Sequence, residues 1–322
     1  MTWLTVDELD ARSDEFDAQV AVTPEIDHFC SSSTWVIPAA RAAAPDQPPF
    51  ICQTEAGTIA MLILSVGDGH RAAVPLEFGW GLAAPFAGAD PDRLVGLLAR
   101  MWSDRRDEVD MLLVSGIPTR GVWMRALSQR FLGTHRIGLG EECVRRLASL
   151  EGGLDGYLSR RSAKFRANMR RDTRRRLAEN LCVDYHRDGD PNQIFQRIID
   201  VETDSWKGRQ GEGFNTEPGL EFYRRILRRL HERRQLRVLF IQRDGEDLAF
   251  VIGAVVDRLY RGLQVSFRQG FASFSLGNLA QYELIARLIS EGVTTYDLGT
   301  DMDYKARWAE SVLATRMVAI VS

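Results

Sequence analysis

Along the later part of the chain, apolar and polar residues alternate with two different spacings. Stretches in which apolar residues recur every three or four positions predict helices at 192–206, 217–234 and 276–290. Short runs rich in apolar residues predict strands at 181–186, 236–242, 248–256, 259–267, 293–298 and 312–321. The pair Asp244-Gly245 predicts a hairpin turn between two of these strands. With a short helix at 303–309, the predicted element order is β-α-α-β-β-β-α-β-α-β.

The first part of the chain repeats most of that order. It has strand-like runs at 49–53, 58–66, 70–76 and 111–114, and helical runs at 90–102 and 120–131. Two short strands then precede Glu151-Gly152-Gly153, where we place the junction. The sequence therefore predicts an α/β (mixed α+β) protein of two tandem domains, residues 1–152 and 153–322. In each domain a mixed, mostly antiparallel sheet is expected to be flanked by helices.

Composition narrows the protein class. The 322 residues are 45% hydrophobic and 26% charged, which is typical of a globular protein with room for two cores. A net charge of −3 argues against nonspecific nucleic-acid binding by the whole surface. No apolar run approaches the roughly 20 residues that span a bilayer, and the N-terminal residues lack a signal-peptide pattern. The four cysteines are far apart, so we expect reduced thiols, no metal site and a cytoplasmic location.

Four stretches in the later part carry a family resemblance. They are the arginine-rich segment 158–171, the loop Glu202–Gly208, the turn Ser275-Leu276-Gly277, and the segment 296–308 with Tyr296-Asp297-Leu298-Gly299 and Tyr304-Lys305-Ala306-Arg307-Trp308. Together, residues 157–310 resemble the CelD/BcsL-like branch of the GNAT acyltransferase superfamily. They are more distantly similar to the Fem-type aminoacyltransferases, which also carry tandem GNAT-like domains. Where members of that branch often have Ser-Pro-Gly, this chain has Ser275-Leu276-Gly277.

The resemblance implies an acyl-coenzyme A (acyl-CoA) donor, such as acetyl-CoA, whose pyrophosphate needs an anion site. A helix N-terminus supplies such a site through its unpaired amides and its dipole. Ser275, Gly277 and Asn278 open the predicted helix 276–290, although Ser275 as an ordinary N-cap is an equal alternative. Lys305 and Arg307 follow the next strand and are candidates to hold donor phosphates or an anionic acceptor. Surface solvation is the alternative for both cations.

Two carboxylates are candidate bases for removing a proton from the acceptor. Asp297 closes the strand 293–298, where an aspartate also commonly caps a turn. Glu202 ends the first helix of the later domain, and a solvated helix end is its alternative role.

Uncharged candidates and one cation complete the predicted site. Trp206 and Lys207 lie on the acceptor-side loop that the resemblance implies, and Tyr304 lies in the last motif. Gln264 and Ser266 alternate along the strand 259–267 and are candidates to bind or polarise the acyl carbonyl, or else are satisfied core positions.

The segment 158–176 has a basic helical face formed by Arg160, Lys164, Arg171, Arg174 and Arg175. Leu158, Phe165 and Met169 lie on the opposite face. Such a helix is a candidate to bind tRNA or another polyanion, and a solvated face is the alternative.

These observations predict direct transfer of an acetyl or longer acyl group from acyl-CoA to an amine or hydroxyl of a small-molecule or saccharide acceptor. The later domain is expected to bind the donor and catalyse. The first is expected to be degenerate and acceptor-shaping, because its corresponding loop, 79–85, lacks the lysine-bearing motif. Two alternatives remain: a Fem-like transferase that uses aminoacyl-tRNA, and a GNAT-like binding module without activity.

Overall fold

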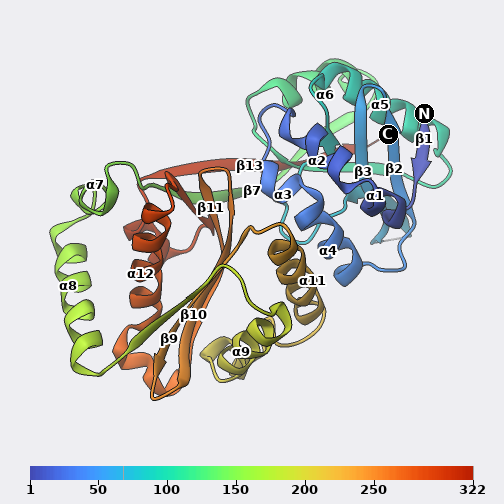
Figure 1. Ribbon diagram of the computed structural model, residues 1–322. Coiled ribbons are helices and arrows are strands. Elements are labelled where there is room, and N and C mark those ends of the chain that lie inside the picture. The colour runs from blue at the N-terminus through green and yellow to red at the C-terminus, as the bar shows by residue number, and fades with distance from the viewer. Residues whose placement is uncertain (68, 322) are drawn as a thin grey trace. The chain divides into compact units, whose positions relative to one another are not determined.

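The computed structural model describes residues 1–67 and 69–321, which form two compact units (Figure 1). Unit 1 consists of Met1–Cys143 together with Ala314–Ser322, and unit 2 consists of Val144–Leu313. The sequence placed the boundary at 152/153 and gave the last strand to the second domain. The structure differs because the C-terminal strand pairs within unit 1.

Unit 1 has a mostly antiparallel sheet with the strand order β1-β2-β3-β4-β6-β13, in which only β4 and β6 are parallel neighbours. The strands are β1 (Thr2–Leu4), β2 (Pro49–Thr54), β3 (Gly57–Val66), β4 (His70–Pro75), β6 (Met111–Ile117) and β13 (Ser311–Val321), with β5 (Phe86–Ala87) paired to β3. The helices are α1 (Val6–Ala11), α2 (Ser13–Ala21), α3 (His28–Ser31), α4 (Ser33–Ala43), α5 (Pro91–Asp104) and α6 (Val122–Phe131). The first four helices have no counterpart in the predicted order.

Unit 2 repeats this plan with the strand order β7-β12-β11-β10-β9-β8, and only β11 and β12 are parallel. The strands are β7 (Arg136–Ser149, of which residues 144–149 belong to unit 2), β8 (Cys182–His186), β9 (Leu236–Arg243), β10 (Glu246–Val256), β11 (Leu259–Phe267) and β12 (Thr295–Thr300). The α-helices are α7 (Gly153–Ser159), α8 (Ala163–Ala178), α9 (Pro191–Thr203), α10 (Trp206–Gln210), α11 (Gly219–Glu232) and α12 (Leu276–Ser290). Two 3₁₀ helices, η1 (Gln269–Phe274) and η2 (Asp303–Arg307), complete it.

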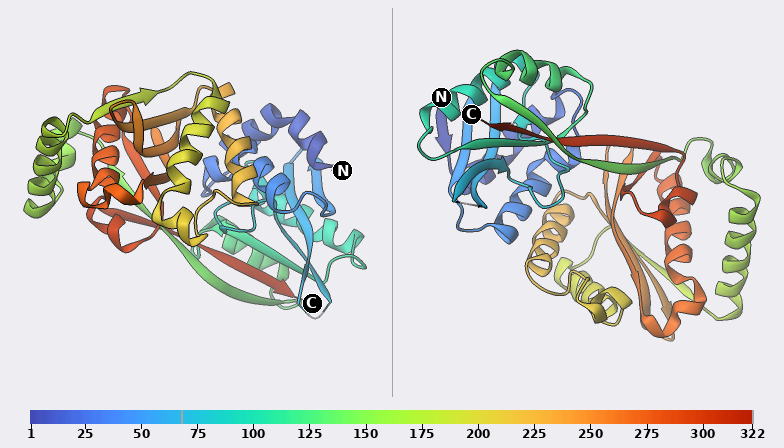
Figure 2. Two further views of the ribbon diagram at one scale, coloured as in Figure 1. Left: turned by 90° about the horizontal axis from the view of Figure 1, so that it is seen from below. Right: turned by 180° about the vertical axis from the view of Figure 1, so that it is seen from behind.

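The two sheets each receive their final strand from an unexpected part of the chain. In unit 1, β6 pairs with residues 316–321 of β13, at the C-terminal end of the sequence. In unit 2, β12 pairs with residues 145–149 of β7, which precede every other element of that unit. The right-hand view of Figure 2 shows β13 ending at the C-terminus beside the strands of unit 1. The predicted fold of two tandem, mostly antiparallel α/β domains is confirmed.

Apolar periodicity explains the layers of unit 2. Figure 1 shows α12 and α8 on one side of the β9–β11 sheet and α9 and α11 on the other. The helix α12 buries Leu276, Leu279, Ala280, Gln281, Leu284, Ile285 and Leu288. Gln281 is the one polar residue in this otherwise apolar buried face, so the groups around its side chain are described with the site below.

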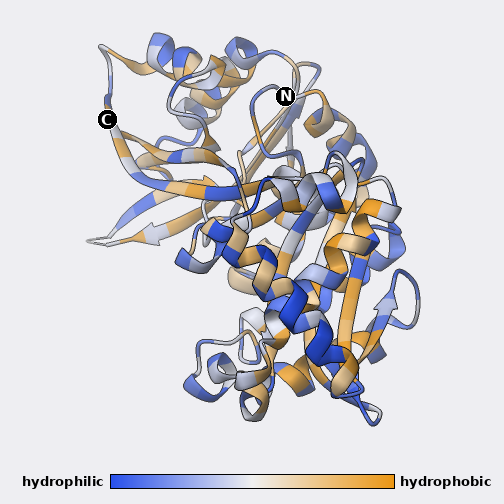
Figure 3. Ribbon diagram, turned by 90° about the vertical axis from the view of Figure 1, so that its left-hand side faces the viewer, coloured by the Kyte–Doolittle hydropathy of each residue, from blue (hydrophilic) through white to orange (hydrophobic). Residues whose placement is uncertain are grey.

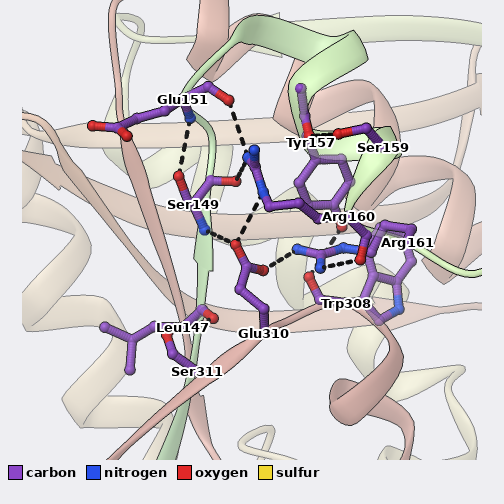
Figure 4. A network of polar contacts seen from close by, with 11 residues as sticks. Leu147, Ser149, Glu151, Tyr157, Ser159, Arg160, Arg161, Trp308, Glu310 and Ser311 are labelled. Atoms are coloured by element: carbon purple, nitrogen blue, oxygen red, sulfur yellow. Dashed lines mark hydrogen bonds and ion pairs between the residues drawn. The ribbon is translucent and has the colours of Figure 1, made fainter.

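The basic segment is two helices rather than one. The chain breaks between α7 and α8 because the Ser162 hydroxyl caps α8 by accepting from the Phe165 amide at 3.1 Å. Figure 4 shows Arg160 and Arg161 turned toward the Glu310 carboxylate, so these two arginines are engaged inside unit 2. On α8, the helix that faces the viewer in Figure 3 and is coloured mostly hydrophilic, Lys164 and Arg174 remain exposed.

Candidate functional site

A cavity opens where two neighbouring strands of unit 2 stop pairing. β11 and β12 pair only between residues 259–261 and 295–297, although β11 continues to Phe267 and β12 to Thr300. The cavity has a volume of about 460 Å³ and is lined by the part of β11 that no longer pairs with β12, the first turns of α10 and α12, and residues in and next to η1 and η2. Its lining residues are Trp206, Lys207, Gln264, Val265, Phe267, Ala272, Ser275, Gly277, Asn278, Gln281, Met302, Tyr304 and Arg307.

The structure brings together eight of the residues singled out from the sequence. These are Trp206, Lys207, Gln264, Ser275, Gly277, Asn278, Tyr304 and Arg307. Four others do not line the cavity, namely Glu202, Ser266, Asp297 and Lys305. Glu202, Ser266 and Asp297 are buried, and Lys305 is hydrogen-bonded to the backbone of Thr300.

The N-terminus of α12 presents unpaired amides to the cavity. Ser275 adopts a left-handed backbone conformation, with φ at 58°, and its side chain makes no capping hydrogen bond. Its carbonyl accepts from the amides of Asn278 and Leu279 at 3.0 and 3.1 Å. Within the described residues, no acceptor faces the amide of Gly277, and such free amides at a helix start favour a bound anion.

Gln281 extends this polar surface deeper into the cavity, and sequence reasoning missed it. The side chain is 4% exposed, yet its Nε2 has no hydrogen-bond partner among the described residues. A buried amide without a partner costs about 1–3 kcal/mol, so a ligand that accepts a hydrogen bond there restores that loss. Its position four residues after Gly277, on the same helical face, is the sequence signal that could have found it.

Arg307 and Lys305, three and one residues from Tyr304, have different surroundings. Arg307 lines the cavity and donates to the Asn278 side-chain oxygen at 3.0 Å, which joins η2 to the first turn of α12. Lys305 Nζ instead donates to the Thr300 carbonyl at 2.8 Å. Burial, followed by repulsion from Arg261, lowers the pKa of Lys305 to about 8.

The pKa of Lys305 predicts a pH-dependent stability. Because its usual pKa is 10.5, the unfolded chain binds more protons than the folded one between about pH 8 and pH 10.5. The lysine therefore makes the free energy of unfolding rise with pH across this window. We expect urea titrations at several pH values to show this rise in the wild-type protein and a flatter profile in Lys305→Met. Identical profiles would show that Lys305 keeps its ordinary pKa.

Lys207, which is partly buried, lies next to the buried Glu202 at the cavity wall. Lys207 Nζ donates to the Val265 carbonyl at 3.1 Å and lies 3.9 Å from Glu202 Oε1. Burial lowers the pKa of Lys207, and the Glu202 charge opposes that effect. Glu202 is fully buried, and its Oε1 has no hydrogen-bond partner in the part of the chain that the structure describes. Gly208 lets the backbone of α10 lie close to the backbone of Glu202, because an added Cβ would lie 2.1 Å from the Glu202 carbonyl oxygen.

Asp297 is held by two arginines rather than directed at the cavity. Its Oδ2 lies 2.8 Å from Arg145 and 2.7 Å from Arg261, and its Oδ1 accepts from the Gly299 amide at 2.8 Å. All three charged side chains are buried. Since both carboxylate oxygens are engaged, this geometry fits a structural link at the last paired position of β11 and β12.

The two polar residues on β11 have different environments. Gln264 lines the cavity, and its Oε1 accepts from the Val265 amide at 3.2 Å. Ser266 is 2% exposed, and its Oγ has no partner among the described residues. The cavity therefore contains the predicted glutamine but not the predicted serine.

The aromatic residues of the last motif have separate roles. Tyr304 lines the cavity, and burial raises its pKa. Trp308 is 1% exposed and packs edge-to-face on Phe165, with 4.9 Å between ring centroids. The Tyr157 hydroxyl donates to the Trp308 carbonyl, as Figure 4 shows, so this tryptophan anchors η2 to the core.

Within 1–67 and 69–321, no helix has the length and apolar composition needed to cross a bilayer. The same residues contain no cluster of three or more His, Cys, Asp or Glu side chains arranged to hold a metal ion.

Comparison with known proteins gives a family match for part of the chain. Residues 163–306 match a family described as an acetyltransferase (GNAT) domain, whereas no curated protein matched the chain. Solved structures share the fold over nearly the whole length. A conserved Bacteroides thetaiotaomicron protein of unknown function is 14% identical with a TM-score of 0.66, covering 99% of this chain and 98% of that one.

Two further structures are similar at comparable length. FemX is 12% identical with a TM-score of 0.66, covering 98% of this chain and 96% of its own. L-PGS from Bacillus licheniformis is 13% identical with a TM-score of 0.61, covering 95% and 90%. At these identities the structures show a shared fold, and the matched domain shows an acyltransferase. Residues 163–306 therefore match a GNAT acetyltransferase domain, and a Fem-like protein is among the structures that share the fold.

Proposed function

We propose that unit 2 transfers an acetyl or longer acyl group from acyl-CoA directly to an amine or hydroxyl of a small-molecule or saccharide acceptor. The observation that carries this proposal is the charge of the cavity at the parted strands. Among its lining residues are Lys207 and Arg307, beside the free amides of α12, and none of the lining residues is acidic. A ligand with an anionic handle fits such a cavity.

The polar groups at the two sides of the cavity suggest how the donor lies. The α12 N-terminus and Arg307 are suited to the pyrophosphate, since both donate hydrogen bonds to anions. Lys207, Gln264 and Trp206 then border the acyl end. Gln281 Nε2 supplies a further donor within the cavity.

Glu202 is the better candidate to accept the proton of the attacking amine or hydroxyl. Asp297 is neutralised by two buried arginines, whereas Glu202 Oε1 keeps a free acceptor position next to Lys207. Because Lys207 lines the cavity, a proton reaches Glu202 through its amine. General base catalysis of this kind contributes about 10²–10⁴-fold to a rate.

Unit 1 closes the equivalent positions with its own carboxylates. Between β4 and α5, the Glu77 side chain accepts from the amides of Trp80, Gly81, Leu82 and Ala83, at 2.6–3.2 Å. At the start of α5, Asp90 accepts from the Arg93 amide at 3.0 Å. Because an internal carboxylate already occupies each set of amides in unit 1, the proposal assigns donor binding to unit 2. Unit 1 then has a supporting role and shapes the acceptor site.

Thermal unfolding with and without acetyl-CoA tests the donor. We expect saturable stabilisation of the wild-type protein, because a ligand that binds only the folded state raises its stability. Gly277→Asp should weaken that binding at least tenfold, since the new carboxylate competes for the α12 amides. The same substitution should not lower stability without ligand, because an acidic residue in the first helical turn is favourable and an added Cβ would make only ordinary contacts, with Phe267 at 3.4 Å and Val265 at 3.7 Å.

Gly96→Asp, on α5 in unit 1, is the matched control, since an added Cβ there meets no atom within 4 Å. It should leave the acetyl-CoA effect unchanged. Equal stabilisation of wild type and Gly277→Asp would contradict the proposed donor site. Stabilisation without transfer to any amine or hydroxyl would instead favour an inactive binding module.

A second donor, aminoacyl-tRNA, is favoured by the surface of α8. Lys164, Arg170 and Arg174 are exposed on this helix, and the structure pairs none of them with a carboxylate among the described residues. Such cations bind nucleic-acid phosphates with a strong salt dependence. Stabilisation by aminoacyl-tRNA that is lost at high salt, without any effect of acetyl-CoA, would select this donor.

A further inference from the structure

Lysine is scarce in this chain, and its few positions are informative. Only Lys164, Lys207 and Lys305 occur among 41 lysine and arginine residues. An arginine stays protonated in any protein environment, whereas a buried lysine loses its proton readily and becomes a nucleophile. The chain therefore uses arginine at nearly all cationic positions, and two of its three lysines lie next to the parted strands of unit 2.

Lys207 is the lysine that lines the cavity. Its Nζ is held by the Val265 carbonyl at 3.1 Å, on the strand that borders the cavity. Glu202 Oε1, 3.9 Å away, has no hydrogen-bond partner among the described residues and is positioned to take a proton from this amine. Burial lowers the pKa of Lys207, which increases the share of the neutral, nucleophilic form.

We propose that Lys207 is an acylation site of the protein itself, and that its amine takes the acyl group from the thioester bound in the same cavity. This inference rests on the proposed function. The neutral Nζ attacks the thioester carbonyl carbon, the carbon–sulfur bond breaks, and coenzyme A leaves as the thiolate. The proton that Nζ releases passes to Glu202, and the product is an acyl-lysine amide.

Acylation changes the cavity in two ways. The amide keeps one N–H, which still satisfies the Val265 carbonyl, but the positive charge beside Glu202 is gone. The acyl group also takes up part of the 460 Å³ volume. Transfer to an external acceptor therefore stops once Lys207 is acylated, so that the modification limits turnover when donor is present without acceptor.

The other two lysines are built-in controls. Lys305 is partly buried and has a pKa lowered to about 8, but its Nζ binds the Thr300 carbonyl and the residue does not line the cavity. Lys164 is exposed on α8. If proximity to the bound donor determines which lysine is acylated, only Lys207 reacts. If a lowered pKa alone determines which lysine is acylated, Lys305 reacts as well.

The experiment incubates the full chain with acetyl-CoA in the absence of acceptor and follows its intact mass, with peptide mapping of the three lysines. We expect one acetyl group per chain, on Lys207, before any on Lys164 or Lys305. Gly277→Asp should slow this reaction at least tenfold, and Lys207→Arg should abolish it. Prior incubation should also lower transfer to an added amine in proportion to the acetylated fraction.

Acetylation spread equally over the three lysines, or equally fast in Gly277→Asp, would overturn the inference. Saturable stabilisation by acetyl-CoA without any mass gain would also overturn it while leaving the proposed function standing. Absence of both stabilisation and mass gain would overturn the proposed function and this inference with it.

Discussion

Replacement of Asp297 by alanine is expected to lower the free energy of unfolding by about 3–5 kcal/mol. The carboxylate lies between Arg145 and Arg261, and all three side chains are buried. Removing it leaves two guanidinium groups together in a dry interior, where desolvation and repulsion both oppose folding. Urea titration of the purified variant measures the change. Asp297→Asn should show most of the loss, because it keeps the shape and removes the charge.

Asp301→Ala is the matched control four residues further along the chain. Asp301 binds Arg146 through two contacts of 2.7 and 2.9 Å, but both side chains are partly exposed. Water replaces such a partner at little cost, so the control should lose far less stability than the Asp297 variant. Comparable losses in the two variants would show that the Asp297 carboxylate is not the link between β7, β11 and β12 that its geometry indicates.

Replacement of Glu202 by glutamine is expected to lower the rate of acyl transfer by about 10²-fold or more at saturating donor. Glutamine has nearly the same size as glutamate, but it does not accept a proton at neutral pH. Stabilisation by acetyl-CoA should persist, because Glu202 does not line the cavity. Initial rates of coenzyme A release, together with thermal unfolding, measure both quantities on one preparation.

Ser266→Ala is the companion variant, since this serine was the one uncharged catalytic candidate. Its Oγ is buried and has no partner among the described residues, so its removal should leave transfer unchanged and stability equal or slightly higher. An undiminished rate in Glu202→Gln would exclude Glu202 as the proton acceptor. A large loss of rate in Ser266→Ala would return the serine to the catalytic site.

Local pattern was sufficient for the element order and for much of the cavity. The apolar period of 276–290 placed the start of α12 at Leu276, and this put Ser275, Gly277 and Asn278 at a helix N-terminus. The alternation of the strand 259–267 and the motif around Tyr304 indicated two further segments that line the cavity. These features depend on residues within a few positions of each other, so the sequence alone determined them.

Pairing between distant segments decided the rest. Arg145 and Asp297 are 152 positions apart, and nothing near either residue indicates that they meet. The pattern of 312–321 predicts a strand but not its neighbour, and β13 pairs with β6 in unit 1. Likewise, the free Nε2 of Gln281 and the approach of Lys207 to Glu202 arise from packing. Hydrophobic period specifies which face of an element is buried, whereas partners and charges across the core are fixed only when the elements pack together.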